Sequence, residues 1–325
     1  MKILERIIIM TQEQFFKNLT PPKGKIDVIL DTDAYNEIDD QFAICYMLAH
    51  AEKFNIKGFC AAPFLNGRSV SAKDGMEKSY REILHLLTLA HRDDLSVITY
   101  LGSESYLGDE KTAVSSPAAS FMAEISKNYS PENPLYIVAI GAITNVASAI
   151  LHNPDMCENC VVIWLGGHAL NFPYGAGEFN MKQDICAARV LFNCGIPLVQ
   201  LPCMGIVDHF STSKYELEHW LKGKNVLCDY LYENTVKEAD SYAYQKPWTR
   251  VIWDVIAVAW LLNDNNIFMD DTLVASPVPE YDFQYATPSF ASNRHFIKYV
   301  YNIKRDALFD DLFTRLINYK LELQK

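Results

Sequence analysis

The sequence lacks an excess of basic residues. Among its 325 residues, 29 are Lys or Arg and 40 are Asp or Glu, so the formal net charge is −11. Nucleic-acid grooves and surfaces that bind anionic membranes need clustered positive charge. The composition therefore argues against nucleic-acid and membrane partners, and it favours an enzyme whose ligand is neutral or cationic.

Long apolar runs are also missing. The runs at 135–140 and 161–165 are far shorter than the roughly 20 residues that span a bilayer. Residues 1–10 contain a Lys and an Arg, but they lack a full apolar segment and a small-residue cleavage site. This is not the pattern of a signal peptide, so we expect a protein without a membrane anchor.

The eight cysteines do not form a recognisable metal site. Most of them lie inside apolar stretches, which indicates buried, reduced thiols and a cytoplasmic location. Cys157 and Cys160 have zinc-knuckle spacing, but no second Cys pair or His pair follows at a suitable distance. We interpret this segment as a turn before a strand.

What the sequence does contain is an alternation of apolar runs and helical patterns. Half of the residues are hydrophobic and 12% are aromatic, as in a well-packed globular protein. Strand-like and helix-like segments alternate as far as about Ser211, which predicts an α/β fold with a mostly parallel central sheet flanked by helices. The expected strands are 26–30, 56–64, 95–101, 135–140, 161–165 and 197–201, and the expected helices are 38–50, 79–91, 117–127, 145–151 and 185–193.

After about Ser211 the pattern becomes helical. No Gly/Ser/Pro-rich linker separates this part from the rest. We therefore predict a single domain over residues 1–325, with residues 1–24 as an N-terminal extension and with C-terminal helices capping the site. The expected C-terminal helices are 215–221, 226–239, 251–262 and 305–323.

Carboxylates gather at the end of the first expected strand. Asp31 and Asp33 close the strand, and Asp39 and Asp40 open the next helix, where ligands of open α/β sheets bind. Four close carboxylates repel one another, and a helix N-terminus offsets only up to about 1 kcal/mol for each. Oxygen ligands without His or Cys favour a hard ion, Ca²⁺ or Mg²⁺. The alternative interpretation is that Asp39 and Asp40 cap the helix while Asp31 is solvated.

Three further segments place polar side chains at strand or helix ends. A Gly after a strand allows a sharp turn and lets the preceding carbonyl face a metal. Glu, Asn and Asp in one loop suit a polyhydroxylated ligand, although such residues are more often helix caps. An Asp before an apolar helix is either a partner of the helix dipole or a metal ligand. The three segments are Gly141–Asn145, Glu178–Asp184 and Trp253–Asp254.

Together these segments resemble the motifs of the nucleoside hydrolase family, of the inosine-uridine-preferring type. The resemblance runs from about Asp27 to the C-terminus, and four motifs in the right order make it specific. The family's Asp-x-Asp-Pro-Gly-x-Asp-Asp is similar to Asp31-Thr-Asp33 with Asp39-Asp40, its Gly-Pro-Leu-Thr-Asn to Gly141–Asn145, its Glu-Phe-Asn-x-x-x-Asp to Glu178–Asp184, and its His-Asp-Pro-Leu-Ala-Val-Ala to Trp253–Ala259.

The resemblance implies a ribonucleoside N-glycosidase with one Ca²⁺ and with a dimeric or tetrameric assembly. It implies that Asp33 is the general base for the attacking water. The implied metal ligands are Asp33, Asp40, Asp254 and the backbone carbonyl of Ile140. The implied substrate-binding residues are Asp39, Asn66, Asn171, Glu178, Asn180 and Trp253, with Asn171 one residue further from Glu178 than in the family.

The sequence departs from the family pattern in two places. The segment Ala34–Ile38 is two residues longer than the family loop and lacks its Pro-Gly, so we expect it to bulge and to bring Asn36 or Glu37 into the site. Trp253 replaces a histidine that protonates the leaving base in much of the family. Because the purine-specific branch has a Trp here, we predict stacking on a purine. His168 is the alternative proton donor, and a core position is the competing interpretation of Trp253.

Two other functions fit parts of the sequence. A non-catalytic binding protein of the same fold retains the metal and the nucleoside without turnover, which agrees with the altered first loop and the missing histidine. A Mg²⁺-dependent phosphatase of the haloacid dehalogenase type also carries Asp-x-Asp at a strand end. That fold needs Gly-Thr soon after the second Asp, where this chain has Ala34 and Tyr35.

Overall fold

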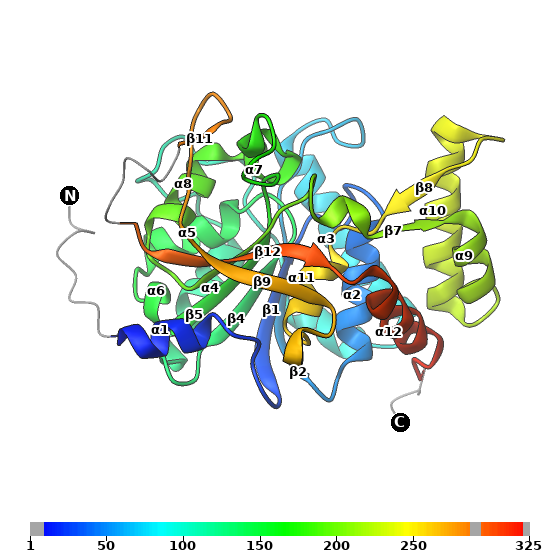
Figure 1. The fold of residues 1–325 in the computed structure, drawn as a ribbon, viewed down its shortest axis with the longest axis horizontal. Coiled ribbons are helices and arrows are strands. Elements are labelled where there is room, and N and C mark those ends of the chain that lie inside the picture. Colours follow the sequence, from blue (N-terminus) through cyan, green and yellow to red (C-terminus); the bar gives the residue numbers. More distant parts are fainter. Residues whose placement is uncertain (1–9, 287–293, 321–325) are drawn as a thin grey trace.

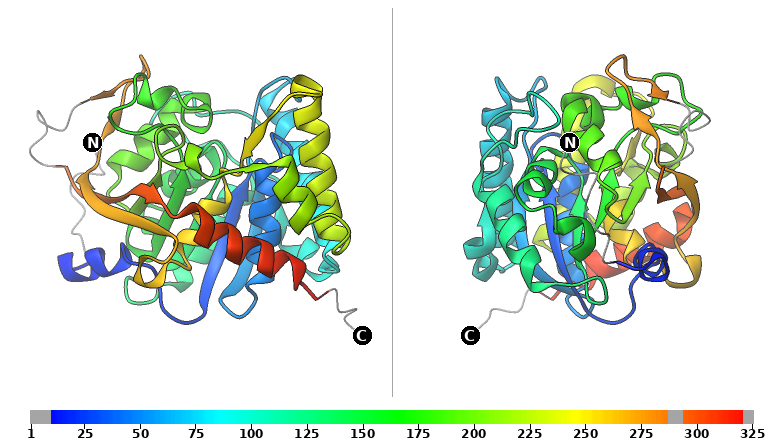
Figure 2. Two further views of the ribbon diagram at one scale, coloured as in Figure 1. Left: turned by 45° about the vertical axis from the view of Figure 1, so that its right-hand side comes forward. Right: turned by 90° about the vertical axis from the view of Figure 1, so that its left-hand side faces the viewer.

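The computed structural model describes residues 10–286 and 294–320 of the chain, and its centre is an eight-stranded sheet with helices on both faces (Figure 1 and Figure 2). Neighbouring strands run parallel except for the last pair, β12 and β9. The prediction of a mostly parallel sheet flanked by helices is therefore confirmed. In spatial order the strands are β3 (Thr99–Tyr100), β2 (Phe54–Ala61), β1 (Ile26–Thr32), β4 (Leu135–Ala139), β5 (Cys160–Leu165), β6 (Leu198–Leu201), β12 (Phe296–Ile303) and β9 (Met269–Ala275).

Each face of the sheet buries its own hydrophobic core, because successive side chains of a strand point to opposite faces. On β1, Val28 and Leu30 join one core and Ile29 joins the other. The first core includes residues of α2 (Asp39–Ala49), α3 (Ala72–Leu89), α9 (Lys214–Trp220), α10 (Val226–Ala243), α11 (Val255–Trp260) and α12 (Arg305–Ile317). The second includes residues of α4 (Pro117–Ile125), α5 (Thr144–His152), α6 (Met156–Asn159), α7 (Phe179–Gln183) and α8 (Ile185–Asn193).

The strand order reverses between β1 and β4. From β1 the chain builds the sheet outward through β2 and β3, whereas β4, β5 and β6 extend it in the opposite direction. Such a reversal leaves a crevice at the carboxyl ends of the two central strands, where open α/β sheets bind ligands. Asp31 pairs in register with Ala139, so the residues that follow both strands meet at this crevice.

Two strands of the sheet lie in the part that we expected to be helical. β12 inserts between β6 and β9, so the C-terminal part of the chain completes the sheet. The segment Phe296–Ile303 is rich in aromatic and β-branched residues, which is a strand signal. The expected C-terminal helices left residues 263–304 unassigned, so both strands were missed at the sequence level.

The strand expected at 95–101 is also mostly absent. Residues Asp93–Ile98 form a 3₁₀ helix, and only Thr99–Tyr100 pairs with β2. The Ser96 hydroxyl donates to the Asp93 carbonyl, so the polar groups here bond locally. Two short antiparallel pairs lie outside the main sheet, β7 (Ser211–Ser213) with β8 (Thr249–Val251) and β10 (Val278–Pro279) with β11 (Tyr285–Ala286).

The N-terminal extension contributes a docked helix, α1 (Gln12–Asn18). The side-chain amides of Gln14 and Asn18 both donate to the carbonyl of Pro131, at 2.9 and 3.0 Å. The Thr11 hydroxyl caps the helix by accepting the N–H of Gln14. Residues 10–18 are thus held against the loop that precedes β4.

The C-terminal helices α9 and α10 stand at one side of the molecule, beside α2 and α3 (Figure 2, left). Near the end of α10, Glu238 pairs with Arg68 and Arg250, and both arginines contact the loop after β1. None of the helices in residues 10–286 and 294–320 has both the length and the apolar character needed to cross a membrane.

Candidate active site

A cavity of about 260 Å³ opens at the carboxyl ends of the central strands. It joins all four segments that the sequence singled out. Its lining residues are Asn36, Glu37, Asp39, Ile140, Leu165, His168, Glu178, Phe179, Asn180, Cys203, Met204, Trp253 and Asp254.

Three carboxylates from distant parts of the chain meet beside this cavity. Asp39, Asp40 and Asp254 each offer an oxygen, and these oxygens lie within 4.8 Å of one another. Asp39 and Asp40 begin α2, whereas Asp254 precedes α11. All three side chains are buried. A buried group of three carboxylates suits a divalent cation with oxygen ligands.

Asp33 is a fourth buried carboxylate of this cluster. Neither of its oxygens has a hydrogen-bond partner among the described residues, and the side chain is fully buried. Burial raises the pKa of Asp33 well above its usual value, and the charges of Asp40 and Asp39 raise it further. A buried ion without partners is costly, so an ionised Asp33 needs a positive charge beside it. The residues present therefore fit a divalent ion.

The other members of the cluster respond to the same crowding. Burial raises the pKa of Asp40 to about 6, although the Thr32 hydroxyl, which donates to it at 2.5 Å, acts in the opposite direction. Burial also raises the pKa of Asp254, and the three other aspartates of the cluster add to the effect. Since metal ligands must be deprotonated, binding of a divalent ion here would release protons.

Asp39 differs because a cation lies nearby. Burial and then the charge of Glu37 raise the pKa of Asp39, whereas Arg250 lowers it. Glu37 belongs to the long loop after β1, and it lines the cavity together with Asn36. Both loop residues that we expected near the site, Asn36 and Glu37, therefore line the cavity.

The turn after β4 is built for a close approach to Asp33. A Cβ atom on Gly141 would lie 3.0 Å from the carboxyl carbon of Asp33 and 3.0 Å from Cβ of Ala62. Only a glycine leaves the Asp33 carboxylate undisturbed at this position. The preceding carbonyl, of Ile140, accepts a hydrogen bond from the Asn180 amide at 3.1 Å.

Glu178 and Asn180 are held rigidly on the opposite wall of the cavity. Glu178 accepts the N–H groups of Gly167, Asn180 and Met181 at 2.8–3.0 Å. Burial raises the pKa of Glu178, and these bonds oppose the rise. The Asn180 amide donates to the carbonyls of Ile140 and Leu165, both at 3.1 Å. Glu178 therefore caps α7 and also lines the cavity, and its contact with substrate stays a prediction.

Asp184, by contrast, serves as a helix cap. Its carboxylate accepts the N–H of Ala187 at the start of α8, and it also accepts the N–H of Leu107 and the hydroxyl of Thr144. It does not line the cavity.

Trp253 and His168 line the same cavity. Trp253 is partly buried and packs on the first hydrophobic core, so it is not a fully buried core residue. Nδ1 of His168 accepts the N–H of Met204 at 3.2 Å, which leaves the ring proton on Nε2. Burial lowers the pKa of His168, so near pH 7 its imidazole is a neutral hydrogen-bond donor.

Two asparagines expected to bind ribose do not line the cavity. Asn171 lies in an exposed loop. The amide of Asn66 donates to Asn36 Oδ1 at 2.5 Å, so it supports a residue that does line the cavity. The interpretation of Asp31 as solvated is wrong, because Asp31 is fully buried and accepts a hydrogen bond from Asn145 at 2.8 Å. Burial raises the pKa of Asp31 to about 7.

Sequence reasoning missed Cys203 and Arg250. Cys203 follows β6 at the same carboxyl edge as the other site residues, and its place after a strand was the available signal. Arg250 lies on β8, and its partner Glu37 is 213 positions away. No local pattern marks such a pair.

The family model of the inosine-uridine preferring nucleoside hydrolases matches residues 28–286 of the chain. Curated relatives include the pyrimidine-specific ribonucleoside hydrolase RihA of Escherichia coli, which is 27% identical over 197 residues. That match covers 54% of this chain and 59% of the relative, so it spans about three fifths of the relative's length.

Solved structures of nucleoside hydrolases share the fold of this chain. A plant nucleoside hydrolase, PpNRh1, superposes with a TM-score of 0.71 at 19% identity, covering 90% of this chain and 99% of that one. An inosine-guanosine nucleoside hydrolase gives a TM-score of 0.72 at 16% identity, with the same coverage. A purine-preferring ribonucleoside hydrolase from Gardnerella vaginalis gives 0.69 at 18% identity, covering 90% of this chain and 98% of that one. With its acidic cluster at the strand-order reversal and a family match over most of its length, this chain belongs to the inosine-uridine preferring nucleoside hydrolase family.

Proposed function

We propose that this protein hydrolyses the N-glycosidic bond of ribonucleosides and releases free base and ribose. The observation that carries the proposal is the environment of Asp33, a buried carboxylate without partners beside Asp39, Asp40 and Asp254. This arrangement lies at the crevice of a chain that belongs to a nucleoside hydrolase family. A structural role does not explain a buried carboxylate whose oxygens find no hydrogen-bond partner by distance and angle among the described residues.

We assign the ion site to Asp33, Asp40, Asp254 and the carbonyl of Ile140, with Ca²⁺ as the ion. Calcium accepts six to eight oxygen ligands in flexible geometry, which suits four protein oxygens supplemented by water and substrate hydroxyls. When bound, the ion polarises a water molecule and neutralises the carboxylates. Asp39 lies in the same trio of oxygens as Asp40 and Asp254, and we assign its carboxylate to a ribose hydroxyl.

Asp33 is the proposed general base. It is a buried carboxylate beside the assigned ion site, and a carboxylate held by the ion is deprotonated and free to accept a proton. Cleavage of an N-glycosidic bond develops positive charge on the sugar, as in other glycoside hydrolyses, and fixed carboxylates around the sugar stabilise that charge. The oxygen of the attacking water bonds to the anomeric carbon and its proton goes to Asp33. The bond to the base breaks with its electron pair passing to the base, which takes up a proton from solvent.

The opposite wall orients the sugar. The three N–H groups that bond to Glu178 fix its carboxylate, and Asn180 uses its amide N–H groups on two carbonyls. The side-chain oxygen of Asn180 is thereby left to accept a hydrogen bond from a ribose hydroxyl. We propose an indirect role for Asn66, through Asn36. Asn171 lies in an exposed loop and does not line the cavity. Its direct contact with ribose stays a prediction.

The leaving base is the part of the substrate on which the relatives differ. RihA is named pyrimidine-specific, whereas two of the solved structures are named for purines or for inosine and guanosine. We propose a purine preference, because Trp253 offers a large aromatic face to a base. Nε2–H of His168 is positioned on the same cavity as a hydrogen-bond donor.

Release of free ribose tests the function. Dialysed protein is incubated with inosine or uridine, with Ca²⁺ or with EDTA, and free ribose is measured. We expect ribose release that needs the ion and is faster from inosine. Binding of inosine in equilibrium dialysis without ribose release identifies a binding protein. Phosphate release from p-nitrophenyl phosphate with Mg²⁺ supports the phosphatase alternative.

We also propose that the protein acts in the cytoplasm, in agreement with its free cysteines, and that it forms a homodimer or homotetramer, as the family resemblance implies. Light scattering coupled to size-exclusion chromatography measures the assembly. A mass near 37 kDa, that of a single chain, contradicts this part of the proposal.

A further inference from the structure

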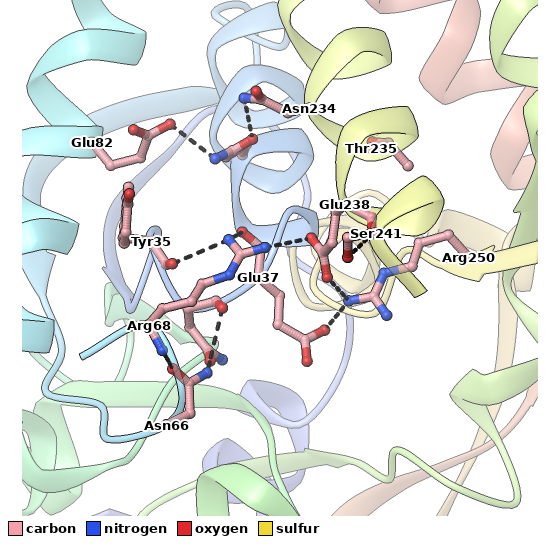
Figure 3. A network of polar contacts seen from close by, with 12 residues as sticks. Tyr35, Glu37, Asn66, Arg68, Glu82, Asn234, Thr235, Glu238, Ser241 and Arg250 are labelled. Carbon is pink, nitrogen blue, oxygen red and sulfur yellow. Dashed lines mark hydrogen bonds and ion pairs between the residues drawn. The ribbon is translucent and has the colours of Figure 1, made fainter. Parts of the chain in front are cut away.

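A network of ion pairs connects the two segments that supply the acidic cluster (Figure 3). One segment is the loop after β1, which leads into Asp39 and Asp40, and the other is β8, which leads into Asp254. Nη2 of Arg250 on β8 pairs with Oε2 of Glu37 in the loop and, at 3.2 Å, with Oε1 of Glu238 on α10.

A second arginine extends the network to the loop backbone. Nη2 of Arg68 pairs with Oε2 of Glu238 at 2.8 Å, and its Nη1 donates to the carbonyls of Tyr35 and Glu37 at 3.5 and 3.4 Å. Glu238 therefore lies between two arginines that both hold the loop (Figure 3). The network contains two positive and two negative side chains, so its charge is balanced.

The position of this network matters because the acidic cluster opposes its own assembly. The charges of Asp39, Asp40 and Asp33 all act on Asp254 in the direction of repulsion. Glu37 precedes Asp39 by two residues, and Arg250 precedes Asp254 by four. The attraction between Glu37 and Arg250 therefore holds together the two segments that the repulsion among the aspartates tends to separate.

We propose that Glu37 and Arg250 are positioning residues that hold the two halves of the ion site at binding distance before the ion arrives. The proposal rests on the proposed function, because it uses the ion site assigned there. A preorganised site spends less binding energy on ordering its ligands. The proposal also gives the longer loop a role, since Glu37 lies in the segment that departs from the family pattern.

The proposal predicts the sign of one measurement. Arg250 is a cation near the site, so a purely electrostatic effect would make the ion bind more tightly when Arg250 is removed. A positioning effect makes the ion bind more weakly. Calorimetric titration of EDTA-treated and dialysed protein with Ca²⁺ distinguishes the two.

Arg189 provides a matched control. It also bridges two glutamates, Glu110 and Glu280, and its side chain is 18% exposed compared with 16% for Arg250. It lies on α8 and does not line the cavity. We expect Arg250→Gln to weaken Ca²⁺ binding by about fivefold or more, within the range of couplings between contacting charges. Arg189→Gln should change it by less than about twofold, although both variants lose an ion pair.

A double-mutant cycle tests whether the two residues act through each other. If they do, Glu37→Gln combined with Arg250→Gln weakens binding by less than the sum of the two single losses, and Arg250→Lys retains part of the affinity. Additive losses in the double variant overturn the proposal, as does unchanged or tighter Ca²⁺ binding by Arg250→Gln. In those cases the proposed function stands, provided that the wild-type protein binds Ca²⁺ and cleaves nucleosides. A wild-type protein that binds no Ca²⁺ overturns the ion site and this proposal together.

Discussion

Asp31 and Asp33 are two positions apart, but they differ in the hydrogen-bond donors that surround them. Asp31 accepts a hydrogen bond from Asn145, and Asn145 is in turn fixed by Ser103, whose N–H and hydroxyl both donate to its side-chain oxygen. Asp33 receives no such donor, and Gly141 leaves space beside it. The chain therefore pairs one oxygen of Asp31 with its own groups, whereas both oxygens of Asp33 lack a partner among the described residues.

This difference predicts two opposite effects of Asp33→Asn. Turnover should fall by about 10²- to 10⁴-fold, the usual loss for a general base. The melting temperature in EDTA should rise, because an amide removes a buried charge that has no partner. Ribose-release kinetics and thermal unfolding measure the two effects, with the exposed Asp264→Asn as a control that changes neither. Near-native turnover would remove Asp33 from the mechanism.

Trp253 allows a test of base preference. A stack between a base and an aromatic side chain is worth about 1–3 kcal/mol, so Trp253→Ala should lower inosine turnover by roughly 5- to 150-fold. Uridine cleavage should fall less. Trp220→Ala is a suitable control, because Trp220 lies on α9 and packs on Phe313 outside the cavity. The stacking role is contradicted if the wild-type protein clearly prefers uridine. It is also contradicted if Trp253→Ala cleaves inosine at the wild-type rate.

At the scale of elements, the ends of β1 and β4 form the site together. The N–H of Ile140 donates to the carbonyl of Asp31 at 2.9 Å, so the sheet pairing extends to the residue that lines the cavity. At the next residue, Gly141, the backbone passes within contact distance of Asp33. The geometry of the carboxylate thus depends on the turn that follows a different strand.

Gly141→Ala should therefore disturb the ion site while the fold remains. The added Cβ would meet the Asp33 carboxyl carbon and Ala62 at 3.0 Å, and overpacking of this kind costs about 1–3 kcal/mol. We expect weaker Ca²⁺ binding in calorimetry and slower ribose release. Gly108→Ala is the matched control, because a Cβ there meets nothing within 4 Å. Equal Ca²⁺ affinity of both variants and the wild-type protein would show that the turn does not set the position of Asp33.

The strands that lead to the site could be predicted from the sequence, because they are short, fully buried apolar runs. The expected strands 135–140 and 161–165 correspond closely to β4 and β5, both buried throughout. The expectation missed β9, whose residues are only partly buried and pair on one side. It missed β12 although that segment carries a strand signal.

The sequence allowed prediction of the site residues that directly follow strands. It did not allow prediction of those whose position depends on partners far away in the chain. Asp33 and Ile140 follow strands directly, and the sequence singled out both. That Asn66 bonds to Asn36 rather than lining the cavity depends on the path of the longer loop. The pairing of Arg250 with Glu37 likewise depends on the tertiary fold, which no local spacing reveals.

At the scale of the whole molecule, the buried carboxylates link stability to pH. A carboxyl whose folded pKa lies above its unfolded value holds its proton more tightly in the folded state. Stability is therefore lost as the pH rises through the folded pKa. Burial raises the pKa of Asp31 to about 7, and the pKa of Asp33 and of Asp254 rises well above the usual value for the same first cause. Each unit of such a shift corresponds to about 1.4 kcal/mol.

We therefore expect the melting temperature of the EDTA-treated protein to fall between pH 6.5 and pH 8. This window lies at or above the ordinary pKa of histidine, so His168 and His295, whose pKa values are lowered by burial, contribute little to the change. Added Ca²⁺ should reduce the fall or reverse it, because the ion binds the deprotonated cluster. Scanning fluorimetry at both pH values, with EDTA and with Ca²⁺, measures this. A melting temperature in EDTA that rises across the window would contradict the assignment of raised pKa values.

The insertion of β12 between β6 and β9 has a consequence for biosynthesis. While the chain grows on the ribosome, β6 has been made by residue 201, but its neighbour is not available until residues 296–303 follow. During that interval β6 presents an open edge, and open edges pair readily with other chains. A nascent chain that stops within this interval thus lacks the strand that pairs with β6, so we expect premature termination to yield a fragment that aggregates.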